Sequence, residues 1–273
     1  MLRQVAQETL QQLAALLGWL CIMGLMLHVL ARTAQYLYMR ALGPTAGTLI
    51  TGWLGTPVHE LGHAIFCPLF GHKIKRLRLW TPFSKDGTAG SVEHAWNRSS
   101  IYQNIGNLFI AAGPILLGSA LILAGFIFLV PGKSTALAAI RGCSSSLWGP
   151  LSEPDCLPAF FNILFYPGSL ASPMFWAFLY GSFCIASHMG LSLLDLKGCL
   201  WGAAVLAVIL LLINVTANLS GFPVWHTYLL RFASSVREMG GILVFAVLMS
   251  FANCCLAAVL FAAGKLMGWI GRG

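Results

Sequence analysis

The chain consists of long apolar runs joined by short polar connections. Uncharged apolar runs of about 20 residues are typical of membrane-spanning helices, because a helix of that length crosses a hydrocarbon core about 30 Å thick. Six spans are predicted, at residues 13–31, 46–70, 103–130, 173–194, 199–219 and 240–264. The connections leave no room for a separate soluble domain, so residues 1–273 are predicted to form a single membrane-embedded domain.

The segment between the second and third runs has the pattern of strands. In KIKRLRLW, residues 73–80, basic and apolar residues alternate, as in a strand with one solvated face. A turn around Asp86 and Gly87 then leads to GSVEHAW at 90–96, which predicts a β-hairpin at the membrane face. The predicted fold class is therefore an all-α polytopic membrane protein of about six transmembrane helices, with a small cytoplasmic β-hairpin or sheet between the second and third.

Composition supports the membrane class, because 58% of the residues are hydrophobic and only 9% are charged, far from the average of soluble domains. The net charge of +8 does not indicate a nucleic-acid partner, since the basic residues lie mainly in the connections. There they orient a chain in the lipid bilayer.

The basic residues predict which side of the membrane carries the hairpin. The segment 71–100 holds six of them against only Asp86 and Glu93, so it is predicted to be cytoplasmic, as are both termini and the active-site side. Arg32 and Arg40 lie in the first outer loop of this topology and count against it. The six basic residues are Lys73, Lys75, Arg76, Arg78, Lys85 and Arg98.

Two of the eight cysteines, Cys143 and Cys156, lie in a polar loop that this topology places outside. Disulfides persist in oxidising compartments, so these two are predicted to be paired. The alternative is two unpaired loop thiols.

The second run contains the motif His-Glu-x-x-His at residues 59–63. Residues four apart share a helix face, so His59 and His63 can present two imidazoles to one ion while Glu60 stands beside the water that the ion holds. The spacing suits a single Zn²⁺ ion. The alternative interpretation is that the three side chains hydrogen-bond within a helix bundle without a metal.

A catalytic zinc site usually takes three protein ligands, and Asp195 is the predicted third. Six of the eight acidic residues lie near the N-terminus or in polar loops, which leaves Glu60 and Asp195. The prediction places Asp195 at the cytoplasmic end of the fourth span, at the depth of the motif, where the ion offsets its charge. His188 and Ser192 share a face of that predicted helix with Asp195. His188 is the alternative third ligand. If it is not a ligand, it could hydrogen-bond to a ligand, donate to the oxyanion of the substrate, or simply pack between helices.

These motifs resemble those of the site-2 proteases, a family of intramembrane zinc metalloproteases. HELGH at 59–63, AAGP at 111–114 and LLDLKG at 193–198 carry the resemblance, which covers about residues 48–200. It implies the compact six-span layout without a PDZ domain, a sheet beside the site, and a bacterial or archaeal cell membrane. Three features depart from the family pattern: Leu117 stands where an Asn often follows Gly-Pro, the Asn-Pro before the Asp is missing, and Asp195 is followed by Leu-Lys-Gly.

The predicted function is hydrolysis of a peptide bond in or near a transmembrane segment of a membrane protein substrate, with Glu60 as general base and zinc held by His59, His63 and Asp195. Asn104 and Asn107, at the start of the third span, are candidate substrate-binding or supporting residues together with His188 and Ser192. The other histidines are interpreted as incidental to the site: His28, His72, His94 and His226.

Three alternatives use the same residues differently. A zinc transporter or sensor binds the ion without hydrolysis, although transport needs no general base beside the first His. A catalytically silent member of the family would serve as a scaffold. A cytoplasm-facing metalloprotease would need Glu93 or Glu153 as a ligand, and both lie in predicted loops.

Overall fold

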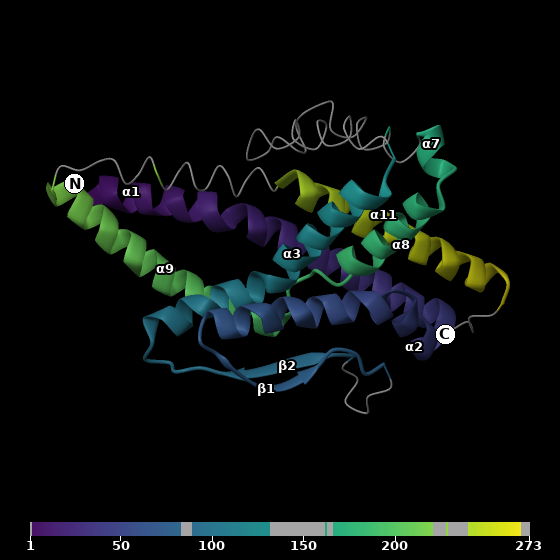
Figure 1. Ribbon diagram of the computed structural model, residues 1–273, viewed down its shortest axis with the longest axis horizontal. Helices are drawn as coiled ribbons and strands as arrows, with labels where there is room; N and C mark the ends of the chain where they lie inside the picture. Colours follow the sequence, from purple (N-terminus) through teal and green to yellow (C-terminus); the bar gives the residue numbers. More distant parts are fainter. Residues whose placement is uncertain are drawn as a thin grey trace.

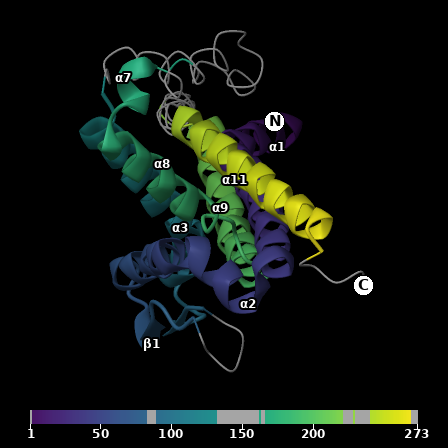
Figure 2. The same cartoon turned by 90° about the vertical axis from the view of Figure 1, so that its right-hand side faces the viewer.

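The computed structural model describes residues 2–82, 89–131, 162, 166–220, 228 and 240–268. This part of the chain is mostly helical, and Figures 1 and 2 show a small sheet at one end of it and α7 at the other. The elements in chain order are α1 (Leu2–Leu13), the π-helix η1 (Ala14–Gly18), α2 (Trp19–Leu69), β1 (Lys73–Arg78), β2 (Ser91–Ala95), α3 (Ile101–Leu129), α7 (Pro167–Leu170), α8 (Pro173–Ala186), α9 (Leu193–Ser220) and α11 (Gly240–Leu266).

Four helical stretches of the described residues are long and apolar enough to cross a membrane, namely Arg3–Leu69, Ile101–Leu129, Asp195–Ser220 and Ile242–Leu266. The helix Pro173–Ala186 is apolar but shorter. The chain thus has the helices expected of a membrane protein, and the count of six spans stays a prediction.

The first of these stretches contains a reversal at Gly43. Gly43 has φ 84° and ψ 165°, a conformation that glycine adopts without a steric cost, and Pro44 after it has no N–H to continue a helix. A Cβ on Gly47 would lie only 2.7 Å from the main-chain nitrogen of Met39, so the two segments fold back on each other. α2 is therefore two helical segments, one before and one after Gly43, which Figure 1 shows running in opposite directions.

The first predicted helix, which ends at residue 31, was wrong at its C-terminal end. The first segment of α2 continues to the turn at Gly43, so Arg32 and Arg40 both lie within a helix. Residues 32–42 include Ala, Arg, Gln, Leu and Met, which are strong helix formers. Their two charges interrupted the apolar run without interrupting the helix.

The predicted fourth span, 173–194, was also wrong at its end. α8 stops at Ala186, and residues 187–192 form an irregular link before α9. Gly190 lies against the first segment of α2, where a Cβ would be 2.6 Å from the Cα of His28. The next helix, α9, begins at Leu193, six residues before the predicted start of the fifth span at residue 199.

The predicted hairpin is confirmed as a two-stranded antiparallel sheet. Lys73 pairs with Ala95 and Arg78 with Ser91, with an irregularity between Ile74 and Arg76. The sheet lies beneath the second segment of α2 in the view of Figure 1. Its predicted turn at Asp86 and Gly87 lies outside the described residues, as do Cys143, Cys156, Glu153 and His226.

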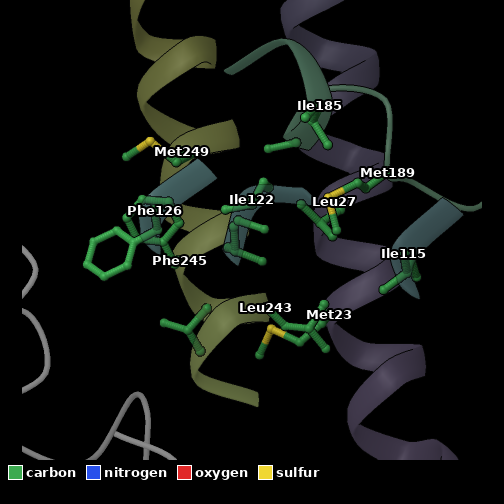
Figure 3. Close-up of a cluster of buried hydrophobic side chains, with 14 of the residues drawn as sticks. Met23, Leu27, Ile115, Ile122, Phe126, Ile185, Met189, Leu243, Phe245 and Met249 are labelled. Atoms are coloured by element: carbon green, nitrogen blue, oxygen red, sulfur yellow. The ribbon is translucent and has the colours of Figure 1, made fainter. Parts of the chain in front are cut away.

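The main hydrophobic core joins α2, α3, α8 and α11. Figure 3 shows Met189, from the link after α8, beside Leu27 of α2, with Ile122 and Phe245 in the same cluster. A second contact is polar: the buried Asn214 of α9 donates to the side-chain oxygens of Thr9 and Gln12, at 2.9 Å each. Polar side chains of this kind bind apolar helices together, and this group holds α1 against α9.

Candidate metal centre

The second segment of α2 presents His59 and His63 on one face, one turn apart, as the spacing predicts. Their Nε2 atoms lie 3.1 Å apart. Glu60 lies between them in the sequence, and its side chain is buried, with 8% of its surface exposed. The segment therefore brings two imidazoles and a carboxylate to the part of α2 that faces the sheet.

Asp195 joins the two histidines, although by a different route from the predicted one. It lies in the first turn of α9 rather than at the end of the fourth span. Its Oδ1 is 3.4 Å from Nε2 of His63, and one donor atom from each of the three residues lies within 4.8 Å of the others. His59, His63 and Asp195 form a group that could hold a metal ion.

Ser192 and Asp195 form a capping box, which orients the carboxylate. The Ser192 hydroxyl accepts from the main-chain N–H of Asp195 at 3.1 Å, and Oδ2 of Asp195 accepts from the N–H of Ser192 at 2.8 Å. This arrangement satisfies two donors at the helix start and leaves Oδ1 facing His63. The sequence Ser-Leu-Leu-Asp before an apolar run carries the signal for this helix start, and the prediction of a longer fourth span overlooked it.

Each histidine is held by a main-chain carbonyl through its other ring nitrogen. Nδ1 of His59 lies 2.5 Å from the carbonyl oxygen of His188, and Nδ1 of His63 lies 2.7 Å from that of Ile110. A carbonyl only accepts, so each Nδ1 carries the hydrogen and each neutral ring has a bare Nε2. Partners of this kind fix the tautomer and orientation of metal-binding histidines.

The carbonyl of Ile110 is free because of Pro114. Four residues along α3, Pro114 has no N–H to donate to it, and His63 takes that place. The helices can approach this closely because a Cβ on Gly62 would lie 2.6 Å from the Cα of Pro114, a contact that only glycine accommodates. Gly113 contacts Gly62 from the opposite helix. The AAGP sequence thus has a structural reason: it provides a close crossing and an acceptor for His63.

Two of the three donor separations in this group are close to those of a tetrahedral metal site, and all three donor atoms lie within 4.8 Å of one another. With bonds of about 2.0–2.1 Å, two donors of a tetrahedral zinc site lie about 3.3–3.4 Å apart, and the two distances to Nε2 of His63 are 3.1 and 3.4 Å. Two bare Nε2 atoms and a carboxylate oxygen are all acceptors, so their contact requires a positive centre, either a proton or a metal. Two imidazoles and one carboxylate are also a ligand set of catalytic zinc sites.

His188 does not belong to this group. It lies in the turn after α8, not on a helix shared with Asp195, and its Nδ1 faces the carbonyl oxygen of Cys184 at 3.0 Å. Its ring also packs against Gly55 of α2. The contribution of His188 to the group is its main-chain carbonyl, which receives His59.

The link that carries His188 is itself held by a buried polar chain. Asn253 of α11 donates to the Ser187 hydroxyl at 2.6 Å and accepts from the Tyr38 hydroxyl at 2.7 Å. Both Asn253 and Tyr38 are almost fully buried. Sequence reasoning missed these residues, because single polar residues in two distant apolar runs carry no signal that they meet.

Two cavities meet at Glu60. One, of about 660 Å³, lies between the candidate metal-binding group and the sheet, where residues 90–94 and Lys75 line it. The other, of about 450 Å³, extends between the two segments of α2 and the link 187–192. His59, Glu60, Gly90 and Ser192 line both. The backbone at Gly90 covers Glu60 closely, since a Cβ there would lie 2.7 Å from Cγ of Glu60.

The two asparagines of α3 have different environments. Asn104 donates to the carbonyl oxygen of Arg98 at 2.6 Å and accepts from the indole of Trp201 at 3.3 Å, so it joins the start of α3 to α9. Asn107 is 5% exposed and lines the larger cavity, and its Nδ2 has no hydrogen-bond partner among the described residues. Buried donors are normally satisfied, which makes Asn107 the better candidate for binding a ligand.

His94 of β2 also lines the larger cavity, although the sequence indicated no role for it. Its Nδ1 is 3.0 Å from Nδ1 of His72, whose Nε2 faces the carbonyl oxygen of Gln103. Burial, together with the smaller effect of the adjacent His72, lowers the pKa of His94 to about 4. His94 is therefore neutral at neutral pH. With its hydrogen directed to His72, the remaining ring nitrogen is an acceptor.

Comparison with protein-family models gives no match, and comparisons with curated proteins and with solved structures give no significant match. The function must therefore be argued from the site.

Proposed function

We propose that the protein is a membrane-embedded zinc endopeptidase, similar in its chemistry to the site-2 proteases, that hydrolyses a peptide bond in or near a transmembrane segment of another membrane protein. The observation that carries the proposal is the grouping of His59, His63 and Asp195, with Glu60 lining the same cavity. A bound zinc ion at this group supplies Lewis acidity and lowers the pKa of a water that it holds.

Glu60 acts as the general base. It is next to His59 in sequence and lines both cavities, so its carboxylate oxygens can accept from a group bound in either. It takes a proton from the attacking water and delivers it to the amine that leaves. Glu60 is buried, and the backbone at Gly90 lies against it.

Asn107 donates to the substrate. Its Nδ2, without a partner among the described residues, lines the cavity that contains the three ligands. A donor in that position binds the carbonyl oxygen of the peptide bond, where negative charge develops during attack. This role replaces that of the Asn which the family pattern would place at Leu117.

The sheet provides the place for an extended substrate. Ser91, Val92, Glu93 and His94 of β2 line the larger cavity opposite the ligands. Hydrolysis needs the substrate helix to unwind, and an extended peptide binds to an exposed strand edge through main-chain hydrogen bonds.

A zinc transporter or sensor is the second candidate. The two cavities that meet at Glu60 favour it, because a moving ion needs an entrance on each side of its binding site. In this case the carboxylate of Glu60 binds the ion as it moves between the two cavities, and no peptide bond is broken.

The experiment compares wild type, Glu60→Gln and, as a matched control, Glu8→Gln on α1, in proteoliposomes. Zinc per protein, zinc flux and cleavage of a library of single-span transmembrane peptides are measured together. The endopeptidase predicts cleavage that falls at least about 10²-fold in Glu60→Gln, with bound zinc and the control unaffected. Zinc flux without cleavage by the wild type would establish the transporter instead, and full cleavage by Glu60→Gln would remove Glu60 from the mechanism.

A further inference from the structure

Arg32 occupies an unexpected position next to the candidate site. It lies in the first segment of α2, eleven positions before the turn at Gly43. It lines the cavity of about 450 Å³ together with His59 and Glu60. A cavity of this size is in the usual range for a ligand-binding pocket.

No acidic side chain neutralises Arg32 in the described part of the chain. It makes no ion pair there, and the carboxylate that lines the same cavity is that of Glu60, which the reaction requires. The wall of the cavity also carries three histidines, His28, His59 and His188, and its uncharged polar side chains include those of Gln35, Thr56 and Ser187. The side chain of Arg32 is exposed towards this cavity, and an ionisable residue in an apolar membrane helix is usually functional.

Arg40, on the same helical segment, has a different environment. Its guanidinium lies 5.9 Å from the ring centroid of Tyr36, in a cation–π contact, and it does not line the cavity. The helix therefore carries one arginine with an aromatic partner and one that lines a cavity and makes no ion pair among the described residues.

We propose that this cavity is an anion-binding subsite, in which Arg32 binds a carboxylate of the substrate. The inference rests on the proposed endopeptidase function and adds a specificity to it. A guanidinium pairs with a carboxylate through two parallel hydrogen bonds. The cavity also reaches Glu60, so a peptide bound there is continuous with the bond that is cut. The carboxylate belongs either to an Asp or Glu side chain near the cut or to the C-terminus of a short substrate.

The first measurement is binding, which does not depend on turnover. Glu60→Gln protein, with or without Arg32→Gln, is placed in phosphatidylcholine liposomes with one transmembrane peptide that carries Glu, Gln or Lys at successive positions. Each peptide is made with a free or an amidated C-terminus. At one position, or at the free C-terminus, the carboxylate should tighten binding at least about tenfold over its neutral counterpart, and Arg32→Gln should remove the difference. The arm that shows the effect identifies the source of the carboxylate.

The second measurement is cleavage of the same peptides by proteins with Glu60 intact. Wild type and Arg40→Gln should prefer the carboxylate peptide by a similar factor, Arg32→Gln should show no preference, and Arg32→Glu should prefer the Lys peptide. Zinc content checks that each variant is folded.

Equal binding of charged and neutral peptides, or a preference that survives Arg32→Gln, would overturn the subsite. An effect of Arg32→Gln that occurs only when phosphatidylglycerol is added would assign Arg32 to a lipid phosphate and would also overturn it. If the protein bound peptides selectively by charge but did not cleave them, the anion-binding subsite would be supported and the endopeptidase function would be contradicted.

Discussion

The imidazole of His63 donates through Nδ1 to the main-chain carbonyl oxygen of Ile110, at 2.7 Å. That carbonyl is available because Pro114, one turn further along α3, cannot donate to it. A proline in an apolar helix thus determines how a histidine of another helix presents its Nε2 atom to the candidate metal site.

Replacing Pro114 with Ala should weaken metal binding without disturbing the helix crossing. Alanine keeps the Cβ and supplies an N–H that competes with His63 for the Ile110 carbonyl. Loss of such an orienting partner typically lowers metal affinity about 10–100-fold. Titration of purified protein with zinc against a competing chelator measures this, and Pro167→Ala in α7 is the control. Equal zinc affinity for Pro114→Ala and wild type would show that the carbonyl does not orient His63.

Asp195→Asn should lose the metal, whereas His188→Ala should keep it. The amide introduced at position 195 would still accept from the N–H of Ser192 and so preserve the start of α9, but it lacks the charge that the ion requires. His188 acts through its main-chain carbonyl, which alanine retains. Zinc per folded protein, measured by elemental analysis, separates the two. Retained zinc in Asp195→Asn and lost zinc in His188→Ala would assign three histidines as ligands.

Gly90→Ala should reduce cleavage more than it reduces metal binding. The new Cβ would lie 2.7 Å from Cγ of Glu60 and 2.7 Å from Cγ2 of Thr56, so Glu60, Thr56 or the backbone before β2 must shift, and the three atoms nearest to it belong to Glu60 and Thr56 rather than to a ligand. A displaced general base should cost at least about tenfold in kcat/KM. Gly181→Ala, where the nearest atom is 3.9 Å away, is the matched control. Unchanged kcat/KM in Gly90→Ala would mean that Glu60 is not held by this contact.

The orientation predicted from the basic residues can be tested at the two ends of the molecule. Ser99, next to the sheet, and Ala171, next to α7, are both exposed, and the figures place the sheet and α7 at opposite ends. In a chain with Cys143 and Cys156 replaced by Ser, Ser99→Cys should resist a membrane-impermeant thiol reagent in intact cells, and Ala171→Cys should react. The opposite labelling would place the sheet and the candidate site outside the cytoplasm.

The sequence by itself determined the features that depend on neighbouring residues. Long apolar runs predicted the helices, alternation predicted the hairpin, and the spacing of four placed His59 and His63 on one face, because these patterns follow from helix and strand geometry. The start of α9 could also have been predicted from neighbouring residues, because the capping box of Ser192 and Asp195 spans only four residues. The structure places Asp195 beside His59 and His63, where it could serve as the predicted third ligand, but on a different helix from the one predicted.

The tertiary structure alone decided what depends on contacts between distant segments. The link after α8 packs against the first segment of α2, where Gly190 lies against the backbone of His28. Arg32, predicted to lie in a loop, lies on that helical segment and lines a cavity that also reaches Glu60. The acceptors that orient His59 and His63 are carbonyls, which every residue possesses, so no side-chain pattern could identify them. Their selection follows from where helices cross, and that is determined by packing over the whole chain.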